Sequence, residues 1–184
     1  MRPAIFLDRD NTIIDNSDHL GDPSGVVLFD RTVESLQRLD DAGYALIIVT
    51  NQSGVARGLF TEDDVQAVHD CIRLQVQKDS GGRDLLAHWY HSPYHPEGVV
   101  EPFITEHPSR KPEPGMLLQA AEDLNLDLNA SWMIGDAPRD IRAGQRAGCR
   151  TILLRCGGFS SMKDPQPDWI VDGIGDATDN ILRP

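Results

Sequence analysis

The sequence predicts an α/β fold in which a doubly wound parallel sheet carries helices on both of its faces. Short apolar runs that end in polar residues alternate along the chain with segments of helical period. Such runs are typical of strands buried on both sides, and repeated β–α units make those strands parallel. The chain has 184 residues, of which 40% are hydrophobic and 25% are charged. These values suit one domain, residues 1–184, with a substantial core.

The first half of the chain is expected to hold three strands and two helices. Val33, Leu36 and Leu39 recur at helical spacing, and the glycine at 43 is a natural residue to follow the end of that helix. Thr61 precedes three acidic residues and is a natural N-cap. The expected elements, in order, are strand Ala4–Leu7, helix Thr32–Ala42, strand Tyr44–Thr50, helix Thr61–Gln77 and strand Leu85–Tyr90.

The second half continues the alternation. Two prolines, Pro112 and Pro114, precede the amphipathic segment 115–124. Gly148 follows the last residue of the next helical segment, 138–147. The expected elements are helix Gly115–Leu124, strand Ser131–Ile134, helix Pro138–Ala147, strands Arg150–Leu154 and Trp169–Val171, and a final helix that closes near Leu182.

Composition restricts the partners and the compartment. The formal net charge of −12 would repel nucleic acid and anionic membrane surfaces, so neither is expected as a partner. We expect neither an apolar leader nor a membrane-spanning stretch, because no apolar run in the sequence is long enough to cross a bilayer. The three cysteines are scattered and suit reduced thiols. We therefore expect a cytoplasmic monomer that builds a local positive site for any anionic substrate.

Two carboxylates, Asp8 and Asp10, follow the first expected strand. Residues spaced i, i+2 on an extended chain point the same way, so both can face one reacting group. Like charges this close are normally tolerated beside a cation or when one of them is protonated. Taken alone, the pair fits a polar strand exit about as well as a catalytic site, and the other motifs decide between these interpretations.

Four motifs occur in order, each near the end of an expected strand or in the loop that follows one. They are Asp8-Arg9-Asp10-Asn11-Thr12, Thr50-Asn51-Gln52-Ser53-Gly54, Arg110-Lys111-Pro112, and Gly135-Asp136 followed by Asp140. In this order they resemble phosphatases of the haloacid-dehalogenase superfamily. More narrowly, residues 50–59 (TNQSGVARGL) and 110–116 (RKPEPGM) resemble the small histidinol-phosphate and heptose-bisphosphate phosphatases. The resemblance implies a Rossmann-like haloacid-dehalogenase fold without a cap domain.

The resemblance also implies catalytic roles. Asp8 would be the nucleophile that forms an aspartyl-phosphate, and Asp10 the general acid and base. Thr50 and Lys111 would hold the phosphoryl oxygens. Mg²⁺ would be bound by the carboxylates of Asp8 and Asp136 and by the backbone carbonyl of Asp10. Asp140 is expected to orient Lys111 or a metal-bound water. Simpler roles, a helix cap for Asp136 and a turn hydroxyl for Thr50, are compatible with these functions.

The substrate is expected to be a small phosphorylated sugar, and the 7-phosphate of a heptose 1,7-bisphosphate is favoured. Arg110 presents a planar fork that suits a second phosphate, whereas histidinol phosphate has a cationic far end. Histidinol phosphate stays open because Asp18 could contact that cation, and a catalytically silent phosphosugar-binding protein is the alternative of another class. The expected substrate-contacting residues are Asn16, Ser17, Asp18, His19, Asn51, Gln52, Ser53 and Arg110.

Some positions depart from the family pattern. Asn11 stands where the family usually has Gly, and Asn is the non-glycine residue that best tolerates left-handed backbone. Ala137 stands where relatives can carry a basic residue. Relatives often hold a structural zinc with a Cys-x-His pair followed by Cys-x-Cys, but here only one of these four positions offers an ordinary zinc ligand. We therefore expect no structural zinc at Ser92, Tyr94, His107 and Ser109.

Overall fold

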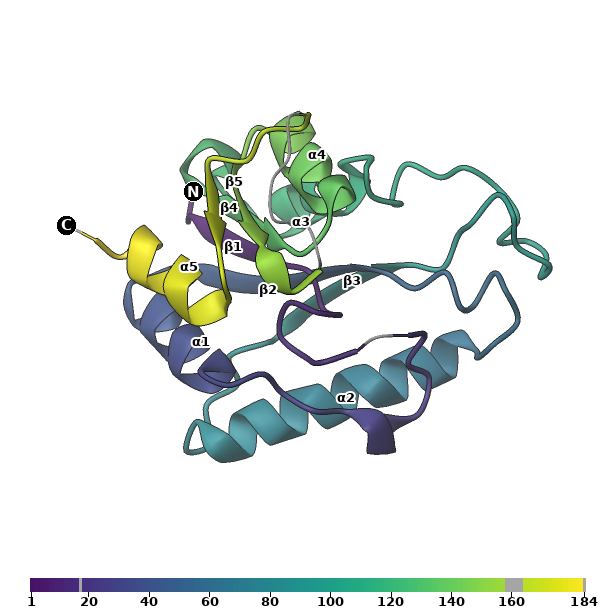
Figure 1. Ribbon diagram of the computed structural model, residues 1–184, viewed down its shortest axis with the longest axis horizontal. Coiled ribbons are helices and arrows are strands. Elements are labelled where there is room, and N and C mark those ends of the chain that lie inside the picture. The colour runs from purple at the N-terminus through teal and green to yellow at the C-terminus, as the bar shows by residue number, and fades with distance from the viewer. Residues whose placement is uncertain (17, 158–163, 184) are drawn as a thin grey trace.

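The computed structural model describes residues 1–16, 18–157 and 164–183, which build a six-stranded parallel sheet (Figure 1). The strands lie in the order β3-β2-β1-β4-β5-β6. The chain runs outward from β1 through β2 and β3, then returns to the other side of β1 through β4. Side chains that follow β1 and β4 therefore meet at the point where the strand order reverses, which is where such sheets bind ligands. The strands are β1 Ala4–Leu7, β2 Ala45–Asn51, β3 His88–Ser92, β4 Trp132–Gly135, β5 Arg150–Leu154 and β6 Trp169–Val171.

Helices cover both faces of this sheet (Figure 1). Ile5 and Leu7 of β1 pack in one cluster with apolar residues of α1, α2 and α5. Ala4 and Phe6, which point the other way, pack with apolar residues of α3 and α4. The predicted doubly wound architecture is thereby confirmed. The helices are α1 Thr32–Asp41, α2 Glu62–Asp79, α3 Gly115–Leu124, α4 Pro138–Ala147 and α5 Ile174–Ile181.

The third strand is the one element whose position the sequence misjudged. It was expected at Leu85–Tyr90, but β3 begins at His88, which pairs with Ile47 of β2. Leu85 and Leu86 are buried, yet they precede the strand. Because β3 lies at the edge of the sheet, most of it stays partly exposed and carries polar residues, so the apolar run did not mark its start.

Long connections after β1 and β3 extend from the edge of the sheet that holds the candidate site (Figure 1). Among its described residues the first contains a short 3-10 turn, Pro23–Gly25, and no other helix, and the second reaches α3 without a helix or strand. The described part of the chain thus inserts no further sheet between the motifs. None of its helices combines the length and the apolar character that crossing a membrane requires.

Candidate active site

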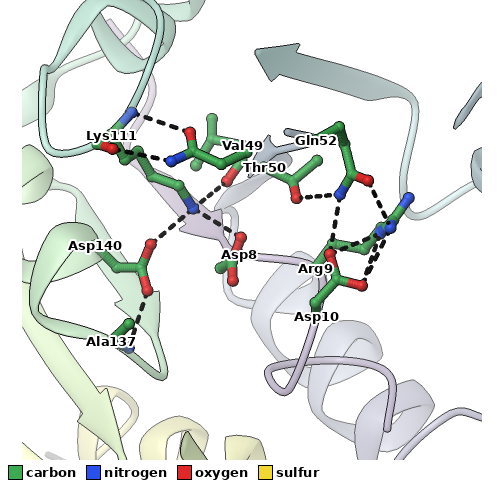
Figure 2. Close-up of polar contacts among 10 residues, drawn as sticks. Asp8, Arg9, Asp10, Val49, Thr50, Gln52, Lys111, Ala137 and Asp140 are labelled. Carbon is green, nitrogen blue, oxygen red and sulfur yellow. Dashed lines mark hydrogen bonds and ion pairs between the residues drawn. The ribbon is translucent and has the colours of Figure 1, made fainter. Parts of the chain in front are cut away.

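A buried lysine links two of the predicted catalytic segments (Figure 2). Lys111 Nζ lies 2.7 Å from Asp8 Oδ1, 2.7 Å from Asp140 Oδ1 and 2.7 Å from the carbonyl oxygen of Val49. The contacts with Asp8 and Val49 are hydrogen bonds, and the contact with Asp140 is an ion pair. Burial lowers the pKa of Lys111, but the charges of Asp140 and Asp8 outweigh it and the net shift is upward. Lys111 is therefore a fixed positive charge beside Asp8.

The backbone of Lys111 is held to β2 by the side chain of Asn51. The Asn51 amide donates to the carbonyl of Lys111 at 2.9 Å, and its oxygen accepts from the Lys111 N–H at 3.0 Å. This reciprocal pair fixes the loop that carries Lys111. Asn51 was expected to contact substrate; both ends of its amide bind the Lys111 loop, and the residue also lines the candidate cavity, so the substrate contact stays a prediction.

Asp140 holds Lys111 from the first turn of α4. Its side chain is fully buried, and Oδ2 accepts the N–H of Ala137 at 3.0 Å. The other oxygen, Oδ1, binds Lys111. This contact fits the expectation that Asp140 orients Lys111, and its role toward Lys111 or a metal-bound water stays a prediction.

Three carboxylates gather around this lysine at the switch point of the sheet. One oxygen each from Asp8, Asp136 and Asp140 lie within 4.8 Å of one another. Asp136 Oδ1 is buried without a hydrogen-bond partner among the described residues. Burial, reinforced by the charges of Asp8 and Asp140, raises the pKa of Asp136 to about 7. Burial also raises the pKa of Asp8 to about 6 despite the opposing charge of Lys111.

This cluster fits a hard divalent cation. A buried carboxylate oxygen that lacks a partner costs free energy, and Mg²⁺ prefers oxygen ligands of this kind. Lys111 and the Ala137 N–H occupy the two oxygens of Asp140, and Lys111 takes Oδ1 of Asp8. Asp136 and the second oxygen of Asp8 are therefore the candidate carboxylate ligands, and the predicted Mg²⁺ ligand set stays a prediction.

The second motif aspartate, Asp10, belongs to a separate network (Figure 2). Gln52 Nε2 donates to Asp10 Oδ2 and to Thr50 Oγ1, each at 2.9 Å. Asn16 Nδ2 donates to Asp10 Oδ1 at 2.6 Å. Gln52 is only 3% exposed, so its side chain serves this network rather than the substrate contact expected from the sequence.

The turn after Asp10 adopts the predicted left-handed backbone. Asn11 has a φ of 55°, a value that the family's usual glycine reaches without strain and that Asn tolerates. Its side-chain oxygen accepts the N–H of Asn16 at 3.2 Å. Asn11 therefore preserves the turn and also anchors the loop that delivers Asn16 to Asp10.

A polar cavity of about 310 Å³ opens beside Asp10. Most of the expected substrate residues line it, namely Asn16, Asp18, His19, Asn51, Ser53 and Arg110, and Ser17 lies outside the described residues. Arg139, which the sequence analysis did not single out, lines it as well. Its position one helical turn after Asp136, on α4, was the available signal. The remaining lining residues are Asp10 and Asn11.

Comparisons with known proteins agree with this geometry. A family model described as HAD-hydrolase-like matches residues 108–177. The D-glycero-beta-D-manno-heptose-1,7-bisphosphate 7-phosphatase of Yersinia pestis is 35% identical over 176 residues, which cover 95% of this chain and 92% of that protein. The protein of the same name from Salmonella typhi is 36% identical over 183 residues, with coverage of 98% and 96%. The chain belongs to the haloacid-dehalogenase-like phosphatases. It is a phosphoric monoester hydrolase.

A solved phosphatase of the same fold supports the assignment. The D,D-heptose 1,7-bisphosphate phosphatase from B. bronchiseptica, complexed with magnesium and phosphate, superposes with a TM-score of 0.84 at 25% sequence identity. The match covers 98% of each chain. The haloacid-dehalogenase fold therefore extends over nearly the whole of this phosphatase.

The four positions at which related phosphatases often carry zinc lie together in this chain. The rings of Tyr94 and His107 stack with centroids 3.9 Å apart and an angle of 13° between their planes. His107 Nδ1 and Ser109 Oγ are 2.7 Å apart, and Ser109 Oγ donates to Ser92 Oγ at 3.1 Å. A stacked pair of rings and two hydrogen bonds thus hold together the segments that a bound metal would otherwise connect. The expected absence of zinc stays a prediction.

Proposed function

We propose that this phosphatase removes the 7-phosphate of D-glycero-D-manno-heptose 1,7-bisphosphate through an aspartyl-phosphate on Asp8, with Mg²⁺ as cofactor. The observation that carries the proposal is the fixed Lys111–Asp8 pair beside a cavity that two arginines line. The cationic side chains suit an anionic substrate on a protein whose net charge is −12. The names of the relatives from Yersinia pestis and Salmonella typhi point to the same substrate.

The chain's own groups support a two-step displacement. An Asp8 oxygen attacks phosphorus, the bond from phosphorus to the sugar oxygen breaks, and protonated Asp10 gives its proton to that oxygen. Water then attacks the aspartyl-phosphate, Asp10 takes a proton from it, and phosphate leaves with Asp8 and Asp10 restored. Lys111 and the Thr50 hydroxyl stabilise the charge that develops on the transferred group.

The carboxylates of Asp8 and Asp136 and the backbone carbonyl of Asp10 would hold Mg²⁺. When bound, the cation neutralises charge on the phosphoryl oxygens and on the carboxylate cluster. The partnerless Asp136 Oδ1 supports this assignment. We expect Mg²⁺ to raise the melting temperature of the protein, and Asp136→Asn to remove most of that rise.

Two arginines favour a substrate with a second anionic group. Arg110 Nη1 donates to the carbonyl of Tyr94 at 3.0 Å, which aims the guanidinium from the loop, and Arg139 reaches the cavity from α4. Neither forms an ion pair with a described carboxylate, and the charge of Arg139 helps to lower the pKa of Arg110. Burial lowers the pKa of Arg139, but the charges of the nearby motif carboxylates outweigh it. A second phosphate on the sugar would satisfy both.

Histidinol phosphate is the alternative substrate within the same reaction. Asp18 lines the cavity and could accept from the distal ammonium group. The two guanidinium groups oppose that cation, because like charges repel across a small cavity. We therefore rank the sugar bisphosphate first.

A substrate panel tests this proposal. Phosphate release is measured with heptose 1,7-bisphosphate, a hexose 6-phosphate and histidinol phosphate, each with Mg²⁺ and after its removal by a chelator. We expect the highest kcat/KM with the bisphosphate and loss of activity without Mg²⁺. A higher kcat/KM with histidinol phosphate would make that compound the substrate in place of the bisphosphate. Activity that persists without any divalent cation would contradict the proposal that Mg²⁺ is the cofactor.

A further inference from the structure

Arg9, between the two motif aspartates, is the largest side chain that is fully buried in the described residues. Desolvation of a guanidinium is costly, and an apolar residue of similar volume often serves stability as well or better. Its only ion-pair partner in the described chain is Asp10, which is 22% exposed and lines the cavity. One guanidinium nitrogen, Nη1, has no hydrogen-bond partner there. This burial therefore calls for a reason other than stability.

The contacts of Arg9 fix the Asp10 carboxylate (Figure 2). Arg9 Nη2 donates to Asp10 Oδ1 at 3.1 Å, and Nε donates to Oδ2 at 3.2 Å, so both oxygens are held by one planar group. A two-point contact of this kind restricts the rotation of the carboxylate as well as its position. Asp10 is thereby held at the rim of the cavity.

Arg9 also determines which way the Gln52 amide faces. Arg9 Nη2 donates to Gln52 Oε1 at 3.0 Å. A guanidinium has donors only, so the amide oxygen must lie on this side and Nε2 must lie on the other. The two hydrogens of Nε2 then go to Asp10 Oδ2 and Thr50 Oγ1. Since Thr50 Oγ1 already accepts one of them, its own hydrogen is available for a phosphoryl oxygen.

We propose that Arg9 is a positioning residue that sets the Asp10 carboxylate for proton transfer and, through Gln52, directs the Thr50 hydroxyl. This inference rests on the proposed role of Asp10 as the general acid. A carboxylate that rotates freely would present its proton to the leaving oxygen for only part of the time. By holding both oxygens, Arg9 would keep the carboxyl group of Asp10 in one orientation beside that atom.

Leaving groups of different basicity separate this role from a structural one. An alkoxide is a poor leaving group and needs the proton of Asp10, whereas 4-nitrophenolate leaves with little protonation. We measure kcat and KM for Arg9→Met and Asp10→Asn on heptose 1,7-bisphosphate and on 4-nitrophenyl phosphate. For Arg9→Met we expect kcat on the sugar ester to fall about a hundredfold and kcat on the aryl ester to fall less than about tenfold, with little change in KM.

A double variant and a conservative variant complete the test. The kcat of the double variant Arg9→Met, Asp10→Asn on the sugar ester should be little lower than that of Asp10→Asn alone. The reason is that both changes disable the same group, the Asp10 carboxyl. If Arg9→Met melts below the assay temperature, Arg9→Lys keeps the buried charge but lacks the fork. The kcat of Arg9→Lys on the sugar ester should still fall by about tenfold, with a smaller loss on the aryl ester.

The outcomes separate the inference from the function on which it rests. Equal losses on both esters for the Arg9 variants, with selective loss for Asp10→Asn, would make Arg9 a structural ion pair and overturn the inference alone. Equal losses on both esters for Asp10→Asn would instead remove its role as the general acid. Multiplicative losses in the double variant would show that Arg9 acts independently of Asp10 and would also overturn the inference.

Discussion

Lys111 and Asp8 form an ion pair in which both side chains are almost completely buried, with 2.7 Å between Nζ and Oδ1. The Lys111 ammonium group also binds Asp140, so one cation serves two buried carboxylates. Removing one partner of such a pair leaves an uncompensated buried charge, which is far more costly than the loss of an exposed ion pair. We therefore expect stability and the proposed catalysis to depend on the same lysine.

Lys111→Met should lower the free energy of unfolding by about 3–5 kcal/mol and abolish turnover. The loss arises because Asp8 and Asp140 keep their burial but lose their counter-charge. Urea unfolding with and without Mg²⁺ measures it, and the divalent cation should restore part of the loss. Lys78→Met is the matched control, because Lys78 is exposed at the end of α2. A loss for Lys111→Met no larger than that of the control would contradict the buried pair.

Asp8→Asn should abolish turnover while the protein stays folded. The amide oxygen can still accept from Lys111, and the neutral side chain avoids the desolvation that raises the pKa of Asp8 to about 6. Phosphate release and the melting temperature are measured for both proteins. Beryllofluoride with Mg²⁺ should raise the melting temperature of the wild type through binding to the folded state, and should have little effect on the variant.

The matched control is Asp63→Asn, which changes an exposed residue in the first turn of α2. It should leave activity and the beryllofluoride response unchanged. An Asp8→Asn protein that retains near-normal kcat with saturable kinetics would exclude Asp8 as the nucleophile.

Arg110→Ala and Arg139→Ala should each impair a sugar bisphosphate far more than a sugar monophosphate. A charge-assisted contact contributes roughly 1.5–3 kcal/mol, so kcat/KM should fall about ten- to a hundredfold on the bisphosphate alone. Arg142→Ala, on the exposed side of α4 and paired with Asp164, is the control. Losses of equal size on both substrates would place the arginine at the transferred phosphoryl group instead of at a distal one.

The sequence was most informative where a single pattern dictates a single structure. Runs such as 45–50 are apolar throughout and form a strand buried on both faces. The glycine-like turn at Asn11 was predicted because few residues tolerate its backbone. The order of the motifs placed Asp8 and Asp136 together because the carboxyl ends of the adjacent parallel strands β1 and β4 share one edge of the sheet.

The sequence was least informative where the direction in which a side chain points decides its role. Gln52 and Asn51 lie in the motif that follows β2, and only coordinates show that their amides point into the protein scaffold. Arg139 was overlooked because a charged residue in the first turn of a helix normally faces solvent. Arg9 was passed over because alternation along a strand would point it away from Asp10, whereas its long side chain reaches back to that carboxylate.

A buried histidine should make stability depend on pH. His69 is 1% exposed, stacks on Trp89 with ring centroids 4.5 Å apart, and has no hydrogen-bond partner among the described residues on either ring nitrogen. Burial, with the charge of Arg9, lowers the pKa of His69 to about 2. The unfolded chain therefore binds a proton below about pH 6.5 that the folded chain does not, and stability falls as the pH drops through that value.

His69→Leu should weaken this dependence. At pH 5 the histidine should account for about 2 kcal/mol of lost stability relative to pH 8, as the difference between wild type and variant. Urea unfolding at both pH values gives that difference, and contributions from other titrating groups cancel in it. His88→Gln serves as the control, because His88 is exposed. Parallel pH dependences for wild type and His69→Leu would show that His69 is protonated in the folded protein.

The protein should fold and work without zinc, because contacts of another kind join the loop segments that the metal clips in relatives. Tyr94 stacks on His107 and meets Phe103 edge-on at 5.7 Å, and Ser109 bonds to Ser92. The same loop carries Arg110 and Lys111, so its order bears directly on catalysis. Tyr94→Ala should therefore lower the melting temperature and kcat together, whereas a zinc-selective chelator should change neither.

Metal analysis of the purified protein should find substoichiometric zinc. A structural zinc needs about four ligands in tetrahedral array, and of the four family positions only His107 offers an ordinary one. A variant that carries Ser92→Cys, Tyr94→His, His107→Cys and Ser109→Cys restores the family pattern and is the positive control for detection. Stoichiometric zinc in the wild type that survives dialysis, and is lost when His95 and His107 are changed to alanine, would establish a histidine-based site instead. Because His95 Nε2 lies 3.1 Å from Arg57 Nη2, a cation there would first have to displace a guanidinium, which argues for the zinc-free state.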